Sequence, residues 1–126
     1  MSTRLDVAKQ LTAAWGQKDE AGFLACVHED YTFQGPMMKL GSAEEAVQCM
    51  KQCDFVATTE NCEVIEEGHT LVHIFDWKVT APFHASIPMI EVLEFEGKKV
   101  KRARLFFDTA LFPAEIKDRM LAGTAA

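Results

Sequence analysis

Apolar and polar positions alternate along the chain with two different periods, which separate helical from extended segments. The apolar positions of residues 5–15 are three or four apart, which predicts an amphipathic helix that ends near Gly16. A second helix is expected after the potential cap Asp19. A third begins at Ser42, where Ser42 and Glu45 form a capping box.

From Phe55 onward the apolar positions recur every second residue, as in a strand with one buried face. Segments 56–66 and 70–80 form one pair, and segments 87–95 and 100–107 form another. Each pair is joined by a short turn that contains a glycine, which predicts two hairpins.

The remaining segments complete an α+β architecture. Residues 31–34 read as a short strand that stops at Gly35, and Pro113 starts a short helical turn that reaches Leu121. Helices on one face of a strongly curved, mostly antiparallel sheet cannot close it fully. We therefore expect one cone-shaped domain over residues 1–126, in which about three helices and the sheet enclose a pocket.

Composition and charge argue against two classes of binding partner, nucleic acids and membranes. The chain has 126 residues, 48% of them hydrophobic, and its 13 Lys+Arg against 19 Asp+Glu give a formal net charge of −6. An acidic domain without a basic footprint is not expected to bind nucleic acid. No leader or bilayer-length apolar run is seen, so we expect a cytoplasmic protein that does not enter a membrane.

Four cysteines are present, and in a reducing compartment they are expected to be free thiols. They are Cys26, Cys49, Cys53 and Cys62. Cys49 and Cys53 would share one helix face, as two metal ligands might, but no second ligand pair completes a site. No bound metal is predicted.

The order of elements and several local strings resemble the nuclear transport factor 2-like superfamily, and within it the group of SnoaL-like polyketide cyclases and ketosteroid isomerases. The strings are residues 15–24, 31–36, 41–46 and 93–108. The resemblance implies a cone-shaped fold with a ligand pocket and no cofactor. It does not imply one reaction, because this scaffold carries unrelated activities and plain binding.

The residue sets of two enzyme families in the superfamily are incomplete here. The isomerase resemblance places Gly35 where the general base would stand and Leu11 where the oxyanion-hole tyrosine would stand, and retains only the acid, as Glu91. The resemblance to limonene epoxide hydrolases retains only Asp76. Neither activity is expected.

Glu91 is the first candidate for acid or base chemistry, and Asp76 is the second. Glu91 shares the more apolar face of its strand with Leu93, so burial should raise its pKa. A salt bridge across the sheet is the alternative. An inward Arg104 would keep Glu91 ionised, whereas an outward Arg104 would leave it protonated.

The strand at 70–80 has two different faces. His73, Phe75 and Trp77 share the more apolar one, and Asp76 lies on the other. Because the family resemblance puts Asp76 on the pocket side, we expect His73, Phe75 and Trp77 to form the interface of a homodimer.

The predicted pocket lining combines aromatic, methionine and aliphatic residues with one arginine. It consists of Trp15, Phe23, Phe33, Met37, Met38, Phe55, Leu93 and Arg104. Such a lining suits a small apolar molecule. Three functions remain open: binding of that ligand, a cofactor-independent isomerase, cyclase or hydratase that uses Glu91 or Asp76, and a non-catalytic dimerisation module.

Overall fold

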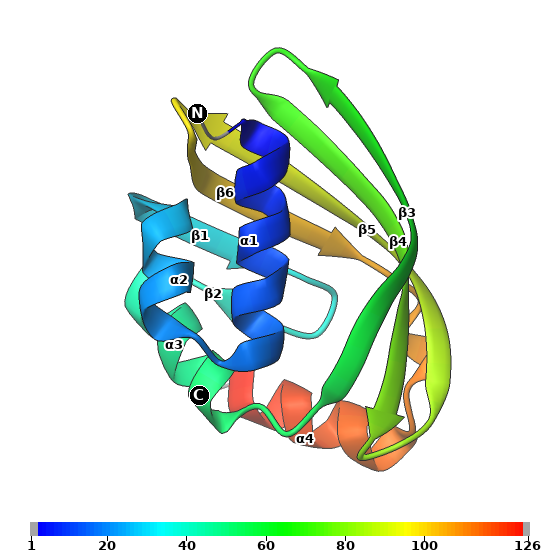
Figure 1. Ribbon diagram of the computed structural model, residues 1–126. Helices are drawn as coiled ribbons and strands as arrows, with labels where there is room; N and C mark the ends of the chain where they lie inside the picture. Colours follow the sequence, from blue (N-terminus) through cyan, green and yellow to red (C-terminus); the bar gives the residue numbers. More distant parts are fainter. Residues whose placement is uncertain (1–2, 125–126) are drawn as a thin grey trace.

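A computed structural model describes residues 3–124 (Figure 1). The helices are α1 (Arg4–Gln17), α2 (Glu20–Cys26), α3 (Ala43–Gln52) and α4 (Ala114–Thr124), with a 3-10 turn at Thr109–Leu111. The strands are β1 (Val27–Gln34), β2 (Lys39–Leu40), β3 (Val56–Glu67), β4 (Thr70–Ala81), β5 (Ala85–Glu96) and β6 (Lys99–Phe106). No helix within the described residues is long and apolar enough to cross a membrane.

Local side-chain caps explain where the first three helices begin. Thr3 accepts a hydrogen bond from the Asp6 backbone and Asp19 accepts one from the Gly22 backbone, so α1 and α2 start with satisfied N–H groups. Ser42 caps α3 by accepting from the Glu45 backbone. The predicted capping box is only half formed, because the Glu45 carboxylate bonds the Gly41 backbone instead.

The six strands form one sheet in the order β2-β1-β6-β5-β4-β3, antiparallel except for β1 against β6. Gly68 and Gly97 take positive φ at the two predicted hairpin turns. Pro88, expected in a connection, lies within β5. A proline has no N–H to donate to a neighbouring strand. It is tolerated here because β6 ends opposite Ile90, so that β5 has no partner strand on its β6 side at Pro88.

The curved sheet has an inner face, covered by helices, and an outer face (Figure 1). Two buried clusters fill the inner side. The first packs α1, α2 and α3 against Leu71 and Leu93. The second packs Phe112, which follows the 3-10 turn, and Ile116 of α4 against Phe75. The predicted α+β class is confirmed, with α4 longer than the expected helical turn.

Candidate functional site

Glu91 lies on the inner face of β5, between the buried residues Met89 and Leu93. The strand register places it directly opposite His73 on β4 and Leu105 on β6. Burial raises the pKa of the Glu91 carboxyl to about 7, because the ionised form loses its hydration. At neutral pH the carboxyl can therefore either give or take a proton.

His73 faces the same interior as Glu91. Its ring packs on Phe75 with the two ring centres 4.6 Å apart. Burial lowers the pKa of the His73 imidazole, because a charged ring would be poorly hydrated there. The imidazole is therefore neutral at pH 7 and retains a lone pair that can accept a proton.

Tyr31, on β1, completes a group of three polar side chains on the inner face. The residue is only 1% exposed. Burial raises the pKa of its phenol, and the negative charge of ionised Glu91 raises it further. The phenol remains protonated at any ordinary pH and is a hydrogen-bond donor within electrostatic reach of Glu91.

The polar atoms of these three residues have no hydrogen-bond partner among the described side chains and are not among the fully shielded atoms. Within residues 3–120, no side-chain hydrogen bond joins Glu91, His73 or Tyr31 to another residue, and the buried side-chain atoms without a partner are Glu94 Oε2 and Arg104 Nε. Glu91 retains partial exposure although burial perturbs its pKa strongly. Glu91 thus lies at the junction of the two clusters, with Met89 of one and Leu93 of the other beside it along β5.

Most of the predicted lining residues belong to the clusters beside this polar group. Phe23, Phe33 and Leu93 are buried in the first cluster, and Met37 is buried in the second. Trp15 and Met38 pack on the first cluster and Phe55 on the second, each partly buried. The aromatic and methionine positions therefore supply apolar walls on both sides of Glu91.

Two predicted inner residues lie on the outer face instead. Asp76 is on the outer side of β4, where its Oδ2 accepts a 2.8 Å hydrogen bond from Asn61 Nδ2. Arg104 is on the outer side of β6, with its Nε 3.8 Å from Glu94 Oε2. Arg104 therefore does not neutralise Glu91, which corresponds to the outward alternative. The resemblance-based placement of Asp76 toward the pocket was wrong.

The assignment of His73, Phe75 and Trp77 to an exposed subunit interface also needs correction. Phe75 is buried in the second cluster, and Trp77 stacks on Phe112 with ring centres 5.8 Å apart. The more apolar face of β4 is thus covered by the C-terminal segment of the same chain. Strand periodicity identified the face but could not identify what covers it.

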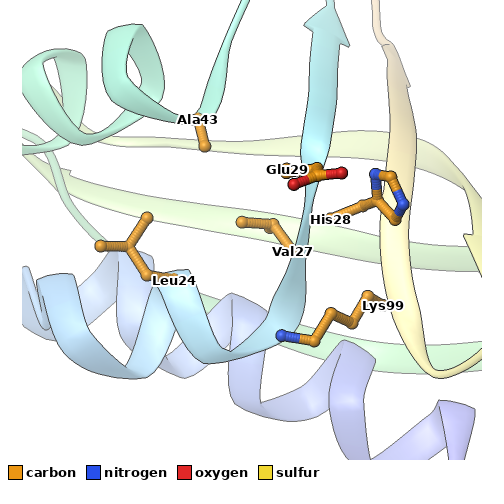
Figure 2. A pocket seen from close by; sticks show the side chains of 6 residues that line it. All are labelled: Leu24, Val27, His28, Glu29, Ala43 and Lys99. Carbon is orange, nitrogen blue, oxygen red and sulfur yellow. The ribbon is translucent and has the colours of Figure 1, made fainter.

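A separate surface groove of about 450 Å³ lies at the start of β1, as Figure 2 shows. Its lining residues are Leu24, Val27, His28, Glu29, Ala43 and Lys99. His28, Glu29 and Asp30 have ligand atoms within 4.8 Å of one another.

Both ring nitrogens of His28 already have partners. Nδ1 accepts a hydrogen bond of 3.0 Å from the Asp30 backbone N–H, and Nε2 lies 2.5 Å from a carboxylate oxygen of Glu96. The cluster is an exposed ionic network.

Solved structures share this architecture. An NTF2-like protein of unknown function from Cytophaga hutchinsonii has a TM-score of 0.74 at 19% identity, over 87% of this chain and 94% of that one. TerC, co-crystallised with polyporic acid, has a TM-score of 0.75 at 17% identity, over 93% and 99%. A candidate polyketide cyclase from Pseudomonas putida KT2440 has 0.72 at 15%, over 88% and 96%. At these identities the likeness establishes the fold alone.

Sequence comparison gives the family. No curated protein matches the chain. The family model of the SnoaL-like domain matches residues 8–103, which span α1 to β6 and include the Glu91, His73 and Tyr31 group. The chain therefore belongs to the SnoaL-like domain family.

Proposed function

We propose that this protein binds a small, mostly apolar molecule against the inner face, with a carbonyl or hydroxyl oxygen of that molecule directed at Glu91. The observation that carries the proposal is the convergence of Glu91, Tyr31 and His73 on one inner surface between two apolar clusters. A concave apolar site with a few polar groups is the usual composition of a small-molecule site.

The chemistry of the three groups specifies the polar end of the ligand. Protonated Glu91 and Tyr31 each offer an O–H, and neutral His73 offers a donor and an acceptor. An uncharged oxygen satisfies these groups, whereas a second buried anion would repel ionised Glu91. Two structural neighbours were crystallised with small molecules, TerC with polyporic acid and a protein from Catenulispora acidiphila with trimethylamine.

Binding can be tested with 1-naphthol and naphthalene as probes, followed through the fluorescence of Trp15 and Trp77. Naphthol should bind more tightly than naphthalene, and Glu91→Leu should remove that preference. Asp76→Asn is the matched control on the outer face and should leave it intact. Equal affinities of the wild-type protein for the two probes, or no binding of either, would contradict the proposal.

A second candidate, acid–base catalysis, is favoured by the direct pairing of His73 with Glu91 across β4 and β5. A neutral imidazole can remove a proton from the carbon next to a carbonyl, while Glu91 and Tyr31 donate hydrogen bonds to the oxygen that gains negative charge. Return of the proton to another carbon would complete an isomerisation, and attack of the enolate on a second carbonyl would complete a cyclisation.

Catalysis can be tested by the exchange of the α-hydrogens of α-tetralone in deuterated water, followed by proton NMR. The wild-type protein should accelerate exchange, and His73→Ala and Glu91→Gln should each reduce it by about 10²-fold or more. Asp76→Asn should exchange at the wild-type rate. Naphthol binding without any acceleration of exchange would sink the catalytic candidate and leave the binding proposal standing.

A further inference from the structure

Three sulfur-bearing side chains gather where α3 lies against β2 (Figure 1). Cys49 belongs to the last turn of α3, and Cys53 is the residue that caps the C-terminal end of that helix. Because the two cysteines are four residues apart, they lie on the same side of the helix. Met38 directly precedes β2, and its Sδ lies 3.2 Å from the Sγ of Cys49. We call these three residues the sulfur cluster.

Backbone hydrogen bonds fix both segments that carry the sulfur cluster. The Met38 carbonyl accepts a 2.7 Å hydrogen bond from the Gly35 N–H, which closes the turn between β1 and β2. The Cys53 N–H donates a 3.3 Å hydrogen bond to the Met50 carbonyl at the end of α3. Rotation of the three side chains is therefore sufficient to bring the sulfur atoms around a common point.

The spacing of the two cysteines suits a bridging ion better than a disulfide. Side chains four apart on a helix have Cβ atoms about 5–6 Å apart, whereas a disulfide requires a Cβ–Cβ distance of about 3.5–4.5 Å. Two sulfur ligands of one metal ion, each with a bond of about 2.3 Å, lie roughly 4 Å from each other. The Sγ atoms of Cys49 and Cys53 can reach that separation without a change in the helix.

The surroundings of the sulfur cluster admit a cation. Cys49 and Met38 pack against the first apolar cluster but remain partly exposed, as does Cys53. An ion therefore has a path from solvent to all three sulfur atoms. The C-terminal end of α3 carries the partial negative charge of the helix dipole, which favours a positive ion beside Cys53.

The ligand set indicates which ion. Among the described residues, the trio of His, Cys, Asp or Glu side chains with clustered ligand atoms is His28, Glu29 and Asp30, so no such trio includes the two cysteines. Structural zinc sites have four ligands of those residue types. A thioether is a soft ligand, and two thiolates with one thioether select Cu(I).

We propose that Cys49, Cys53 and Met38 bind one Cu(I) ion through their three sulfur atoms. The cysteines bind as thiolates, so two S–H protons pass to solvent as two Cu–S bonds form, and the copper enters and remains as Cu(I). The sequence alone offered only the two cysteines, and the fold supplies the third ligand from a turn outside the helix. The site does not depend on Glu91 or on the ligand proposed for the inner face.

Competition with the chelator bicinchoninate tests the site. Without oxygen, the reduced full chain should take one equivalent of Cu(I) from the coloured Cu(I)–bicinchoninate complex. Cys49→Ser and Cys53→Ser should each weaken binding by more than the roughly 10–100-fold that loss of a second-shell partner costs. Cys62→Ser, which changes an exposed thiol on β3, is the matched control and should bind as the wild type does. Failure of the wild-type protein to take copper overturns the proposal, as does wild-type affinity in Cys49→Ser or Cys53→Ser.

X-ray absorption of the copper complex tests the third ligand. The wild-type complex should show three sulfur neighbours, and Met38→Leu should show two, with an affinity about tenfold lower. Leucine has a similar volume, so the circular dichroism of this variant should match the wild-type spectrum. Met50→Leu, at a fully buried position of α3, is the control and should retain three. Three sulfur neighbours in Met38→Leu, or nitrogen or oxygen neighbours in the wild-type complex, overturn the proposed ligand set.

Discussion

The two faces of the sheet are built from the same strands and are both apolar at their centres, yet they have different environments. On the inner face of β4 and β5, Leu71, Phe75 and Met89 are buried under helices of the same chain. On the outer face, Ile74, Ile90 and Val92 remain accessible in the isolated chain. The two faces therefore differ in whether helices of the same chain pack against them.

The two faces also treat acidic side chains differently. On the outer face, Glu60 lies 3.7 Å from Lys78 and Glu94 lies 3.2 Å from Arg102. Glu91, on the inner face of the same strand, has none within ion-pair distance among the described residues, and its pKa rises to about 7. An ionisable group kept apart from counter-charges in a folded interior is a marker of function.

The largest expected difference between the faces is in packing. Ile87 is fully buried in the second cluster, whereas Ile90, three residues along β5, is 41% exposed. Ile87→Ala should lower the free energy of unfolding by about 2–5 kcal/mol. Ile90→Ala should cost less than about 1 kcal/mol in the monomer. Urea unfolding at a concentration where the chain is monomeric measures both, and equal losses would contradict the assignment of inner and outer faces.

Much of this comparison could be predicted from the sequence. The two-residue period separated His73, Phe75 and Trp77 from Asp76, and the glycines located two hairpin turns that the structure reproduces. These features are local, since they depend on alternation along one strand and on positive φ at one residue.

The features that were missed depend on contacts distant in sequence. Phe75 is covered by Phe112 and Ile116, and strand periodicity contains no information about that cover. Tyr31 reaches the inner face because β1 lies parallel to β6, a pairing between segments about seventy residues apart. The pairing of His73 with Glu91 had a usable signal, because a tight turn at Pro82 places the two residues opposite each other.

The second expected effect is the pH dependence that Glu91 contributes to stability. Its folded pKa of about 7 exceeds the ordinary value of 4.5, so the native state holds this proton more tightly than the unfolded state. The stabilisation is complete below pH 4.5 and is lost as the pH rises through 7, by about 3 kcal/mol. Glu91→Gln should abolish this loss when unfolding is measured from pH 4.5 to 8. Glu63→Gln, on the outer face, should retain it, and a wild-type slope in Glu91→Gln would refute the shifted pKa.

His73 should give a smaller effect of opposite direction. Its folded pKa lies below the ordinary value of 6.5, so the native state resists protonation. Stability is present above pH 6.5 and is lost as the pH falls through the folded pKa. His73→Phe should therefore reduce acid sensitivity between pH 7 and 5 in the same unfolding assay. His84→Asn, in an exposed connection, is the control, and the idea fails if both variants behave alike.

The smallest expected effect comes from an ion pair on the outer face. Lys78 Nζ lies 3.7 Å from Glu60 Oε2, and both side chains are about half exposed. Solvent screening and the entropy of two flexible side chains offset most of the attraction of such a pair. Glu60→Gln should change the free energy of unfolding of the monomer by less than about 0.5 kcal/mol, with little dependence on salt. A loss of unfolding free energy as large as that of Ile87→Ala would contradict this prediction. Exposed charges on the outer face would then stabilise the monomer as much as the buried core does.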